Sequence, residues 1–292
     1  MGQSLEKYLG HYWLSRPGVK KHRELVKASV RKLASHLGRP PVISDLTDET
    51  LNGFLASLAD SSLSRWTIKG HRARLLALWR FACEDGLIDR EPRKVRSVAV
   101  PPLKVEGWNE DQLARLVAAA RSQQGCFRRS RISRRDFAVA LVLAAYDIGA
   151  RLGDLERLPV TALDEPVVWW VQGKTGKEQT ARFRPETVGA MRKIVSPDRD
   201  AIFGGALNRK NFYRFWRGLV KSAGLKGTFR YLRRTSGSLI DRDHPGWGHR
   251  HLGNRPDVFR AHYEVRRLTQ SAEHRPLPPA IETMVTVTPS AV

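Results

Sequence analysis

Several side chains of this sequence have the types that chemistry at a phosphate diester requires. Such a reaction needs a nucleophile, fixed positive charge around the non-bridging phosphate oxygens, and an acid for the leaving oxygen. Arg151 and Arg233 could supply the charge, because a guanidinium group binds phosphate through two hydrogen bonds and stays charged at any relevant pH. Tyr263 could be the nucleophile, and Lys174 could be the acid.

The sequence around Arg151 is typical of a rigidly held arginine. Gly149 offers a turn after an apolar segment, and Arg151 stands at the start of the next helical segment. The residues alone also allow a simpler interpretation, in which Arg151 only pairs with Asp154 at a helix start.

Two later segments carry Arg233 and Tyr263. Residues 230–238 read Arg-Tyr-Leu-Arg-Arg-Thr-Ser-Gly-Ser, and residues 251–263 begin His-Leu-Gly-Asn and end His-Tyr. Taken alone, Tyr263 would be interpreted as a half-buried core tyrosine. Its place after the other segments is what makes it a candidate nucleophile.

Between these segments the pattern changes from helical to extended. Residues 167–171 are strand formers, and Thr180 to Phe183 offers a return strand. The residues between them, 173–177, read Gly-Lys-Thr-Gly-Lys and have the glycines of a hairpin turn. A turn with two lysines is ordinarily a solvated loop, so Lys174 gains significance only from the other segments.

The order of these residues along the chain resembles that of the tyrosine recombinase, or phage integrase, family. The matching positions, in sequence order, are Arg151, Lys174, Arg233, Leu252-Gly253 and Tyr263. One short motif would match by chance often enough, whereas four in the family's order form a more specific signal. The resemblance covers about residues 4–267, which is nearly the whole chain.

Each box matches with small differences. The first arginine box of the family is Gly, an apolar residue, Arg, two residues and Glu-Leu, and here Asp154 stands in place of the glutamate. Residues 230–235 resemble the His-x-Leu-Arg-His-Thr box, and residues 173–178 resemble the Gly-Lys-x-x-Lys-Glu turn. The nine positions from Asn254 to Tyr263 equal the usual family interval between the Leu-Gly-His motif and the nucleophilic tyrosine.

Two departures from the family concern its histidines. Arg230 stands where the second box has histidine, and arginine can hold a phosphate but cannot accept a proton at neutral pH. Asn254 stands where the Leu-Gly-His motif has histidine or tryptophan, and it can donate a hydrogen bond without charge. An alternative alignment assigns this role to Gly248-His249, which then lies too far from Tyr263.

The resemblance implies a mechanism without a nucleotide cofactor or metal. Tyr263 would attack a scissile phosphate and form a 3′-phosphotyrosyl link. Arg151 and Arg233 would hold the non-bridging oxygens, and Lys174, in preference to Lys177, would be the acid for the 5′ oxygen. Arg230 and Asn254 would add binding.

Composition independently favours a nucleic-acid partner. The 292 residues include 51 Lys and Arg against 29 Asp and Glu, a formal net charge of +22 that attracts polyanions. No apolar run approaches the roughly 20 residues of a membrane-spanning helix, and residues 1–21 read as polar and basic, without a signal peptide. Cys83 and Cys126 lie far apart without metal-ligand spacing. These features predict a metal-free intracellular protein.

The first hundred residues are expected to be helical. A helix with Val26, Val30, Leu33 and Leu37 on one face ends at Gly38, and a second follows Thr47. A third is expected from about Leu63 to Asp85, with a basic face opposite its apolar one. That basic face alone is equally consistent with an ordinary solvated surface.

A linker and a second domain are expected to follow. Residues 97–105 include Pro101 and Pro102 and have no helical period. Asn109 with Gln112 forms a capping-box signature, Ser133 precedes a segment that is apolar nearly all round, and helices resume near Pro185 and Asn208. The tail from Pro276 onward is expected to be mobile or docked on a neighbour.

These observations predict a mainly α fold with a small β-sheet. The expected domains are a helical, SAM-like core-binding domain (1–98), a linker (99–107), a catalytic domain of the DNA breaking-rejoining fold (108–267) and a C-terminal tail (268–292). By resemblance, the two domains would form a C-shaped clamp on double-stranded DNA, and the protein would act as a homo-tetramer on paired sites.

The function expected from the resemblance is site-specific recombination or integration of DNA, by a cytoplasmic, nucleoid-associated protein of a mobile element or a host. Three alternatives stay open at this point. The chain could be a recombinase-derived protein that binds DNA but cuts slowly or not at all, because Arg230 and Asn254 replace histidines. It could instead be a basic DNA-binding regulator without covalent chemistry, or an enzyme similar to type IB topoisomerases.

Overall fold

The computed structural model of the chain describes residues 2–16, 20–165 and 167–269. The chain divides into two compact units between Pro102 and Leu103, a position that lies within the expected linker 99–107. Among the described residues no helix is both long enough and apolar enough to span a membrane. The tail from Pro276 lies outside the described residues, and the clamp arrangement of the two units stays a prediction.

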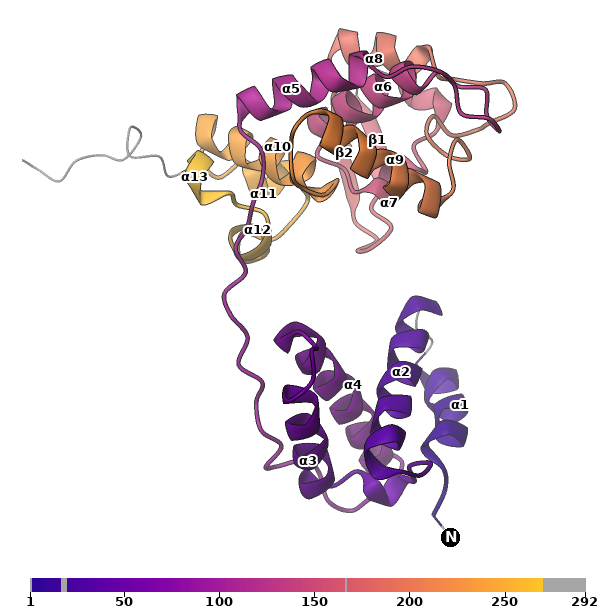
Figure 1. Ribbon diagram of the computed structural model, residues 1–292, viewed down its shortest axis with the longest axis vertical. Helices are drawn as coiled ribbons and strands as arrows, with labels where there is room; N and C mark the ends of the chain where they lie inside the picture. Colours follow the sequence, from indigo (N-terminus) through magenta and orange to yellow (C-terminus); the bar gives the residue numbers. More distant parts are fainter. Residues whose placement is uncertain (1, 17–19, 166, 270–292) are drawn as a thin grey trace, which may run out of the picture. The chain divides into compact units, whose positions relative to one another are not determined.

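The N-terminal unit is helical in its described part (Figure 1). Its elements are α1 (Leu5–Ser15), α2 (Lys20–Leu37), the 3-10 helix η1 (Ile43–Asp45), α3 (Asp48–Ala59) and α4 (Arg65–Glu84). The side chains of Thr47 and Ser64 cap α3 and α4 by accepting hydrogen bonds from the backbone N–H groups of Thr50 and Thr67. Apolar side chains of all four α-helices form one buried core.

Helix α1 corrects the description of residues 1–21 as polar and basic. Leu5, Tyr8, Leu9 and Tyr12 of this helix are buried in the core of the N-terminal unit. They recur at the spacing of one helix face, so a narrow apolar stripe lies within a segment whose average composition is polar.

The C-terminal unit contains the remaining elements. These are α5 (Glu110–Arg121), α6 (Arg134–Asp147), α7 (Leu152–Leu155), η2 (Val160–Leu163), β1 (Val168–Val171), β2 (Glu178–Ala181), α8 (Pro185–Arg192), α9 (Arg209–Ser222), α10 (Arg230–Asp243), α11 (Gly248–His251), α12 (Pro256–His262) and α13 (Arg266–Thr269). The expected mainly helical fold with a small sheet is confirmed.

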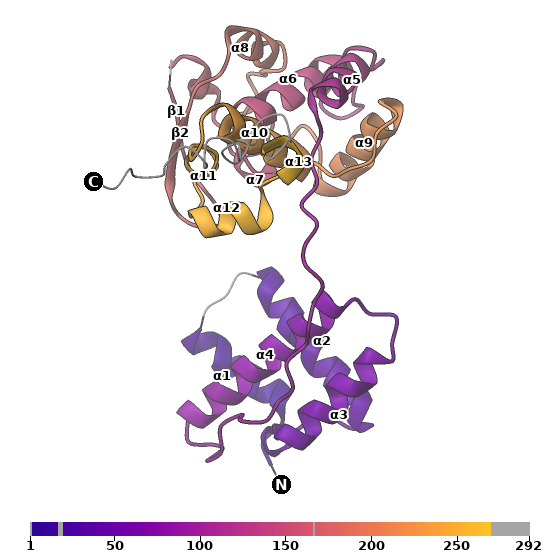
Figure 2. The same ribbon diagram turned by 90° about the vertical axis from the view of Figure 1, so that its left-hand side faces the viewer.

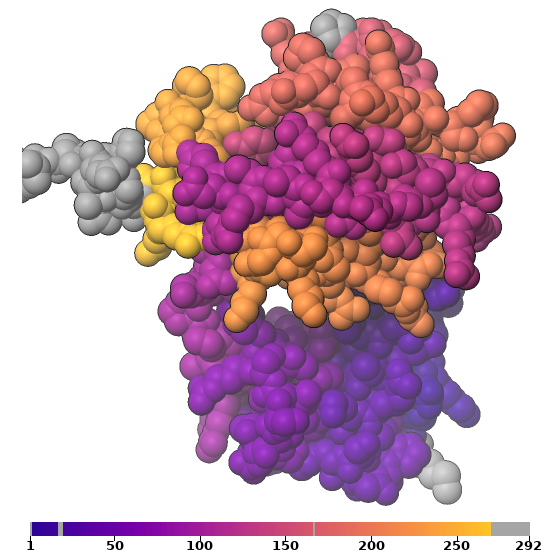
Figure 3. Space-filling model, turned by 45° about the horizontal axis from the view of Figure 1, so that its top comes forward, coloured from indigo at the N-terminus to yellow at the C-terminus, as the bar shows by residue number. Residues whose placement is uncertain are grey.

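Helix α6 lies at the centre of this unit. Most of its residues from Phe137 to Ala145 are buried, and the helix packs against α5, α8 and α10 (Figure 2). The prediction of a central, apolar helix after Ser133 is confirmed, and Ser133 caps it by accepting a hydrogen bond from Asp136 N–H. On the face seen in Figure 3, α5 (magenta) lies directly against the orange segment that contains α9.

The hairpin β1–β2 differs from its prediction at the return strand. Strand β2 pairs from Glu178, opposite Val171, to Ala181, opposite Val168, rather than from Thr180 to Phe183. The turn is tight, with the Gln172 N–H donating to the Lys177 carbonyl, so pairing resumes at once. After Ala181 the chain leaves the sheet because Arg184 N–H donates to the Asp147 carboxylate at the end of α6.

Candidate active site

Helix α10 carries the arginines of the second box. Arg230 and Arg233 lie one helical turn apart and both line the same pocket. Close packing of α11 and α12 against α10 requires a residue without a side chain at Gly237, where a Cβ atom would lie 2.7 Å from Leu252 and 3.2 Å from Phe259. Helix α10 therefore places Arg230 and Arg233 toward the pocket. At Gly237 it packs against the segment that leads to Tyr263.

Arg233 is held by backbone carbonyls of two distant segments. Its side chain is almost completely buried, with 3% of the residue exposed. It donates hydrogen bonds to the carbonyls of Gly149 and Leu252, the latter at 2.6 Å. Burial, followed by the charge of Arg151, lowers the pKa of Arg233 to about 10, so the guanidinium group is still charged at neutral pH. These bonds fix a positive charge that cannot move away from the pocket.

Gly149 permits this arrangement. Its φ of 55° lies in the left-handed region, and a Cβ atom there would lie 2.5 Å from the Leu252 side chain and 2.9 Å from the His251 ring. His251 is itself paired, since its Nε2 lies 2.8 Å from the Ser236 hydroxyl. Burial, with the charge of Arg233, lowers the pKa of His251 to about 4, so the imidazole is neutral at physiological pH.

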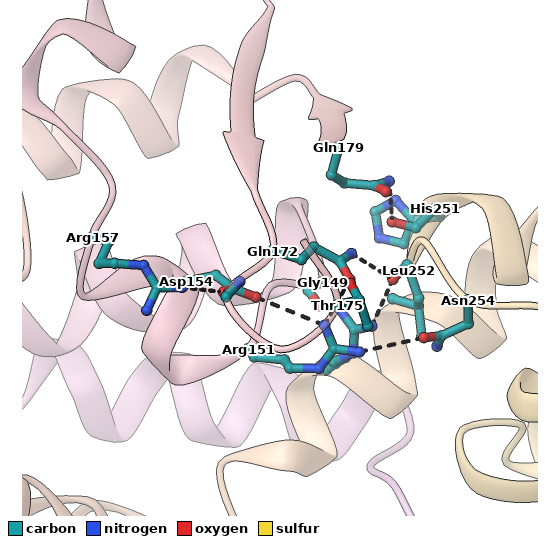
Figure 4. Close-up of polar contacts among 12 residues, drawn as sticks. Gly149, Arg151, Asp154, Arg157, Gln172, Thr175, Gln179, His251, Leu252 and Asn254 are labelled. Carbon is teal, nitrogen blue, oxygen red and sulfur yellow. Dashed lines mark hydrogen bonds and ion pairs between the residues drawn. The ribbon is translucent and has the colours of Figure 1, made fainter. Parts of the chain in front are cut away.

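Arg151 lies at the N-cap position of α7 and reaches two other segments (Figure 4). It donates to the Gln172 side-chain oxygen at 2.8 Å and to the Asn254 side-chain oxygen at 3.4 Å. The pairing with Asp154 is loose, at 3.9 Å. Asp154 instead binds Arg157 at 2.7 Å and the Gly173 N–H at 3.0 Å. The simpler interpretation of Arg151 as a partner of Asp154 alone therefore does not describe its surroundings.

Tyr263 is placed by the backbone around it. At the end of α12, the Arg234 side chain donates to the His262 carbonyl at 3.1 Å. The Ser238 hydroxyl lies 3.3 Å from the Tyr263 carbonyl and accepts a hydrogen bond from the Val265 N–H at 2.8 Å. The guanidinium carbon of Arg233 lies 4.9 Å from the centre of the Tyr263 ring. Helix α10 thus supplies both the cation and the contacts that hold the tyrosine beside it.

Two opposing influences set the ionisation of Tyr263. Burial is the largest single influence and favours the neutral phenol, but the charges of Arg233 and Arg151 together outweigh it. The pKa of Tyr263 therefore lies below the ordinary value for tyrosine. A larger fraction of the side chain is phenolate at a given pH than for a tyrosine in water.

This ionisation can be measured without any reaction. We expect the ultraviolet titration difference between the wild type and Tyr263→Phe to show one phenol that ionises below the ordinary tyrosine pKa. Tyr231 is the internal contrast, because burial and the hydrogen bond to Glu106 raise its pKa. The wild-type minus Tyr231→Phe difference should appear at higher pH, and a Tyr263 component at or above the ordinary value would contradict the arrangement described.

Of the other expected site residues, Lys174 and Arg230 line the same pocket, whereas Asn254 is not among its lining residues. Lys174 is exposed in the turn between β1 and β2, and Arg230 is exposed at the start of α10. Asn254 bonds Arg151 through its oxygen, while its Nδ2 atom is buried without a hydrogen-bond partner among the described residues. His249 of the alternative alignment is not among the residues that line the pocket.

The pocket has a volume of about 720 Å³ and is strongly cationic. Its charged lining residues are Arg151, Arg157, Lys174, Arg209, Arg230, Arg233, Arg234 and Asp154. Seven cations thus face one carboxylate, which is itself bound to Arg157. The arrangement suits a polyanionic ligand whose phosphate can lie beside the phenol of Tyr263.

Sequence reasoning missed several residues of this site. Arg157 and Arg209 line the pocket, and neither was among the expected site residues. Gln172 was not identified, yet it is 1% exposed and bonds Arg151. A signal for Gln172 existed, because the alternation of β1 places it on the same face as buried Val168.

Part of the C-terminal unit matches a known protein family. Residues 108–242 match the family model described as the phage integrase family. Tyrosine recombinase XerD of Ralstonia nicotianae (strain ATCC BAA-1114 / GMI1000) is 22% identical over 206 residues, which are 69% of this chain and 64% of that protein. The matched region thus spans less than two thirds of this curated relative.

Solved structures of integrases have the same fold. A lambda integrase tetramer bound to a Holliday junction aligns with a TM-score of 0.71 at 18% identity, over 96% of this chain and 80% of that chain. The Tn1549 transposon integrase in complex with a circular intermediate DNA aligns with a TM-score of 0.66 at 13% identity, over 97% of this chain and 99% of that chain.

The family match includes Arg151, Lys174 and Arg233, and Tyr263 follows it in the same compact unit. These four residues, which follow one another in the order of the sequence motifs, all line one pocket. Residues 108–242 therefore match the phage integrase family, and the chain has the fold of solved integrases.

Proposed function

We propose that the protein is a site-specific DNA recombinase or integrase that cuts and rejoins DNA through a 3′-phosphotyrosyl intermediate. The observation that carries this proposal is the position of the Tyr263 ring, 4.9 Å from the guanidinium carbon of buried Arg233, in a pocket also lined by Arg151 and Lys174. A nucleophile, fixed positive charge and an acid are thus available around one phosphate.

The cleavage step follows from these positions. The phenolate oxygen of Tyr263 attacks the scissile phosphorus, and the bond from phosphorus to the 5′ oxygen breaks. Lys174 donates a proton to that oxygen as it leaves, which yields a free 5′ hydroxyl and a phosphotyrosyl link to the 3′ end. Attack by the 5′ hydroxyl of another strand reverses the step and releases Tyr263.

Arg151 and Arg233 stabilise the charge that develops on the non-bridging oxygens. Both guanidinium groups are already oriented by hydrogen bonds to protein groups, so little reorganisation accompanies the reaction. The phenolic proton is lost to water, because the two arginines favour the phenolate. Arg230 replaces the family's histidine at the entrance of the pocket, and it contributes charge rather than a base.

The partner in this proposal is double-stranded DNA, bound as a homo-tetramer on paired sites. The net charge of +22 and the cationic pocket support DNA as the partner. Among proteins of similar fold, lambda integrase has been solved as a dimer on a COC′ core site and as a tetramer on a Holliday junction. Sedimentation of the protein with one site and with two sites tests the assembly.

A suicide substrate tests the chemistry. DNA that loses a short 5′-hydroxyl fragment by diffusion after cleavage should leave a stable covalent adduct with the protein. Protease digestion and mass spectrometry should place the DNA on the peptide of residues 261–266, which contains Tyr263. Absence of adduct at a proven binding site would overturn the proposal and favour a DNA-binding regulator. Relaxation of supercoils by a monomer would instead favour a topoisomerase.

The second candidate is a recombinase-derived protein that binds DNA and cuts slowly or not at all. It is favoured by the two replaced histidines, since Arg230 cannot accept a proton and Asn254 carries no charge. The rate of adduct formation at saturating DNA distinguishes the two candidates, because tight binding with a very slow rate or no adduct supports the second.

Arg230→Ala provides a sharper test of the first departure. Arg230 is exposed and can bind phosphate but cannot act as a base, so we expect weaker DNA binding with a nearly unchanged rate of adduct formation at saturating DNA. The affinity should also become less salt-dependent. Arg230→Lys is the matched control and should keep most of the affinity. A large fall of the saturated rate would show that Arg230 takes part in the chemistry.

A further inference from the structure

Gln172 connects three segments of the site through one side-chain amide (Figure 4). It is the residue directly after β1, and it is 1% exposed. Its Oε1 atom accepts hydrogen bonds from Arg151 at 2.8 Å and from the Thr175 hydroxyl at 2.9 Å. Its Nε2 atom donates to the Leu252 carbonyl at 3.2 Å.

The bond to Arg151 holds a cation without neutralising it. A carboxylate at this position would also accept from Arg151, but its charge would compete with a bound phosphate for the guanidinium group. The neutral amide leaves the positive charge of Arg151 available to a ligand. The amide also gives Arg151 a closer partner than Asp154, which lies 3.9 Å away.

The bond to Thr175 holds the turn that carries Lys174. The turn is closed by the backbone of Gln172, which donates to the Lys177 carbonyl and accepts from the Gly176 N–H at 2.8 Å. Lys174 itself is exposed and makes no hydrogen bond to the rest of the described chain that would place it. Its position therefore depends on the attachment of its neighbours in the turn.

The bond to Leu252 joins this turn to Arg233. The Leu252 carbonyl accepts from Gln172 and also from the Arg233 guanidinium group, at 2.6 Å. One carbonyl is thus shared by the residue that holds the lysine turn and by the buried arginine. The three cations that the proposed reaction uses are linked through a single amide group.

We propose that Gln172 is a positioning residue that sets the Lys174 turn in register with Arg151 and Arg233. This inference rests on the proposed function. It predicts that the loss of Gln172 impairs two parts of the reaction at once: the protonation of the leaving oxygen through Lys174, and the stabilisation of charge through Arg151.

Two substrates separate these parts. One is the ordinary suicide substrate, and the other carries sulfur in place of the 5′ bridging oxygen of the scissile phosphate. A thiolate leaves without protonation, so the sulfur substrate does not need the acid. A variant impaired only in the acid is restored on sulfur, and a variant impaired in charge stabilisation is not.

The variants divide the three bonds of Gln172. Thr175→Val removes only the attachment of the turn, so we expect slower cleavage of the oxygen substrate that is restored on sulfur. Gln172→Leu, of similar volume, should lose about 10-fold to 100-fold on oxygen and be restored only in part. Gln179→Leu is the matched control, because Gln179 of the same hairpin bonds the carbonyls of Arg250 and His251 but not the arginines of the pocket. It should cleave both substrates nearly as the wild type does.

A measurement without activity accompanies these rates. Hydrogen exchange in residues 172–178 should be faster in Gln172→Leu and Thr175→Val than in the wild type, while thermal unfolding shows that each variant folds. Wild-type rates of Gln172→Leu on both substrates, or equal losses in Gln172→Leu and Gln179→Leu, would overturn the inference. If the wild type forms no adduct on either substrate, the proposed function fails, and unchanged exchange in the turn of Gln172→Leu would then overturn the positioning role separately.

Discussion

Tyr263→Phe is expected to abolish the covalent DNA adduct completely. The phenyl ring has no oxygen to attack phosphorus. Among the described residues, Tyr263 is the tyrosine whose ring lies over the Arg233 guanidinium group. The substitution should not disturb the fold, because the phenyl ring keeps the contact of the Tyr263 ring with Arg233, and hydrogen bonds to the backbone place this segment.

Two measurements on the same protein check this prediction. Adduct formation on the suicide substrate should fall below detection, and DNA affinity should stay close to that of the wild type. Tyr213→Phe and Tyr231→Phe are suitable controls, since both tyrosines line the pocket and should still allow adduct formation. An adduct that persists in Tyr263→Phe and moves to another residue would refute Tyr263 as the nucleophile.

Arg233→Lys is expected to reduce the rate of adduct formation by about 10²-fold to 10³-fold at saturating DNA, the effect of losing one preorganised donor to the transition state. A lysine keeps the charge but lacks the planar fork, so it cannot hold both carbonyls and also offer a bidentate contact to phosphate. The shorter ammonium group cannot replace both hydrogen bonds to the Gly149 and Leu252 carbonyls. We therefore expect the free energy of unfolding to fall by about 1–3 kcal/mol.

Single-turnover kinetics and urea unfolding of the same preparation separate the two effects. Arg209→Lys is the matched control. Arg209 also lines the pocket, but it is exposed and its side chain binds Glu156 at 2.6 Å, so both the rate and the stability should change little. A rate of Arg233→Lys within a few-fold of wild type would show that the buried guanidinium group is structural rather than catalytic.

Much of the fold was readable in short stretches of sequence. The helix starts at Thr47, Asn109 and Ser133 were predicted from their side chains, and each accepts the expected backbone hydrogen bond. Such caps depend on residues within one turn of the helix, so the sequence specifies them locally. Helix α1 was missed because four apolar residues in a polar segment are visible only when the helical period is applied.

The candidate site divides in the same way. The sequence by itself determined which residues could react, because the order of Arg151, Lys174, Arg233 and Tyr263 is a one-dimensional pattern. The tertiary structure alone decided that Arg233 is buried, that Asp154 binds Arg157 more closely than Arg151, and that Gln172 joins the lysine turn to both arginines.

The physical reason is the sequence distance of the contacts. Gln172 and Leu252 are 80 positions apart, and Arg151 and Asn254 are 103 positions apart. These bonds exist only because α10 and α11 pack closely enough to bring the Leu252 carbonyl beside Arg233 and the end of β1. Side-chain types and local periods specify the groups available for chemistry, whereas burial and partners follow from how the helices pack.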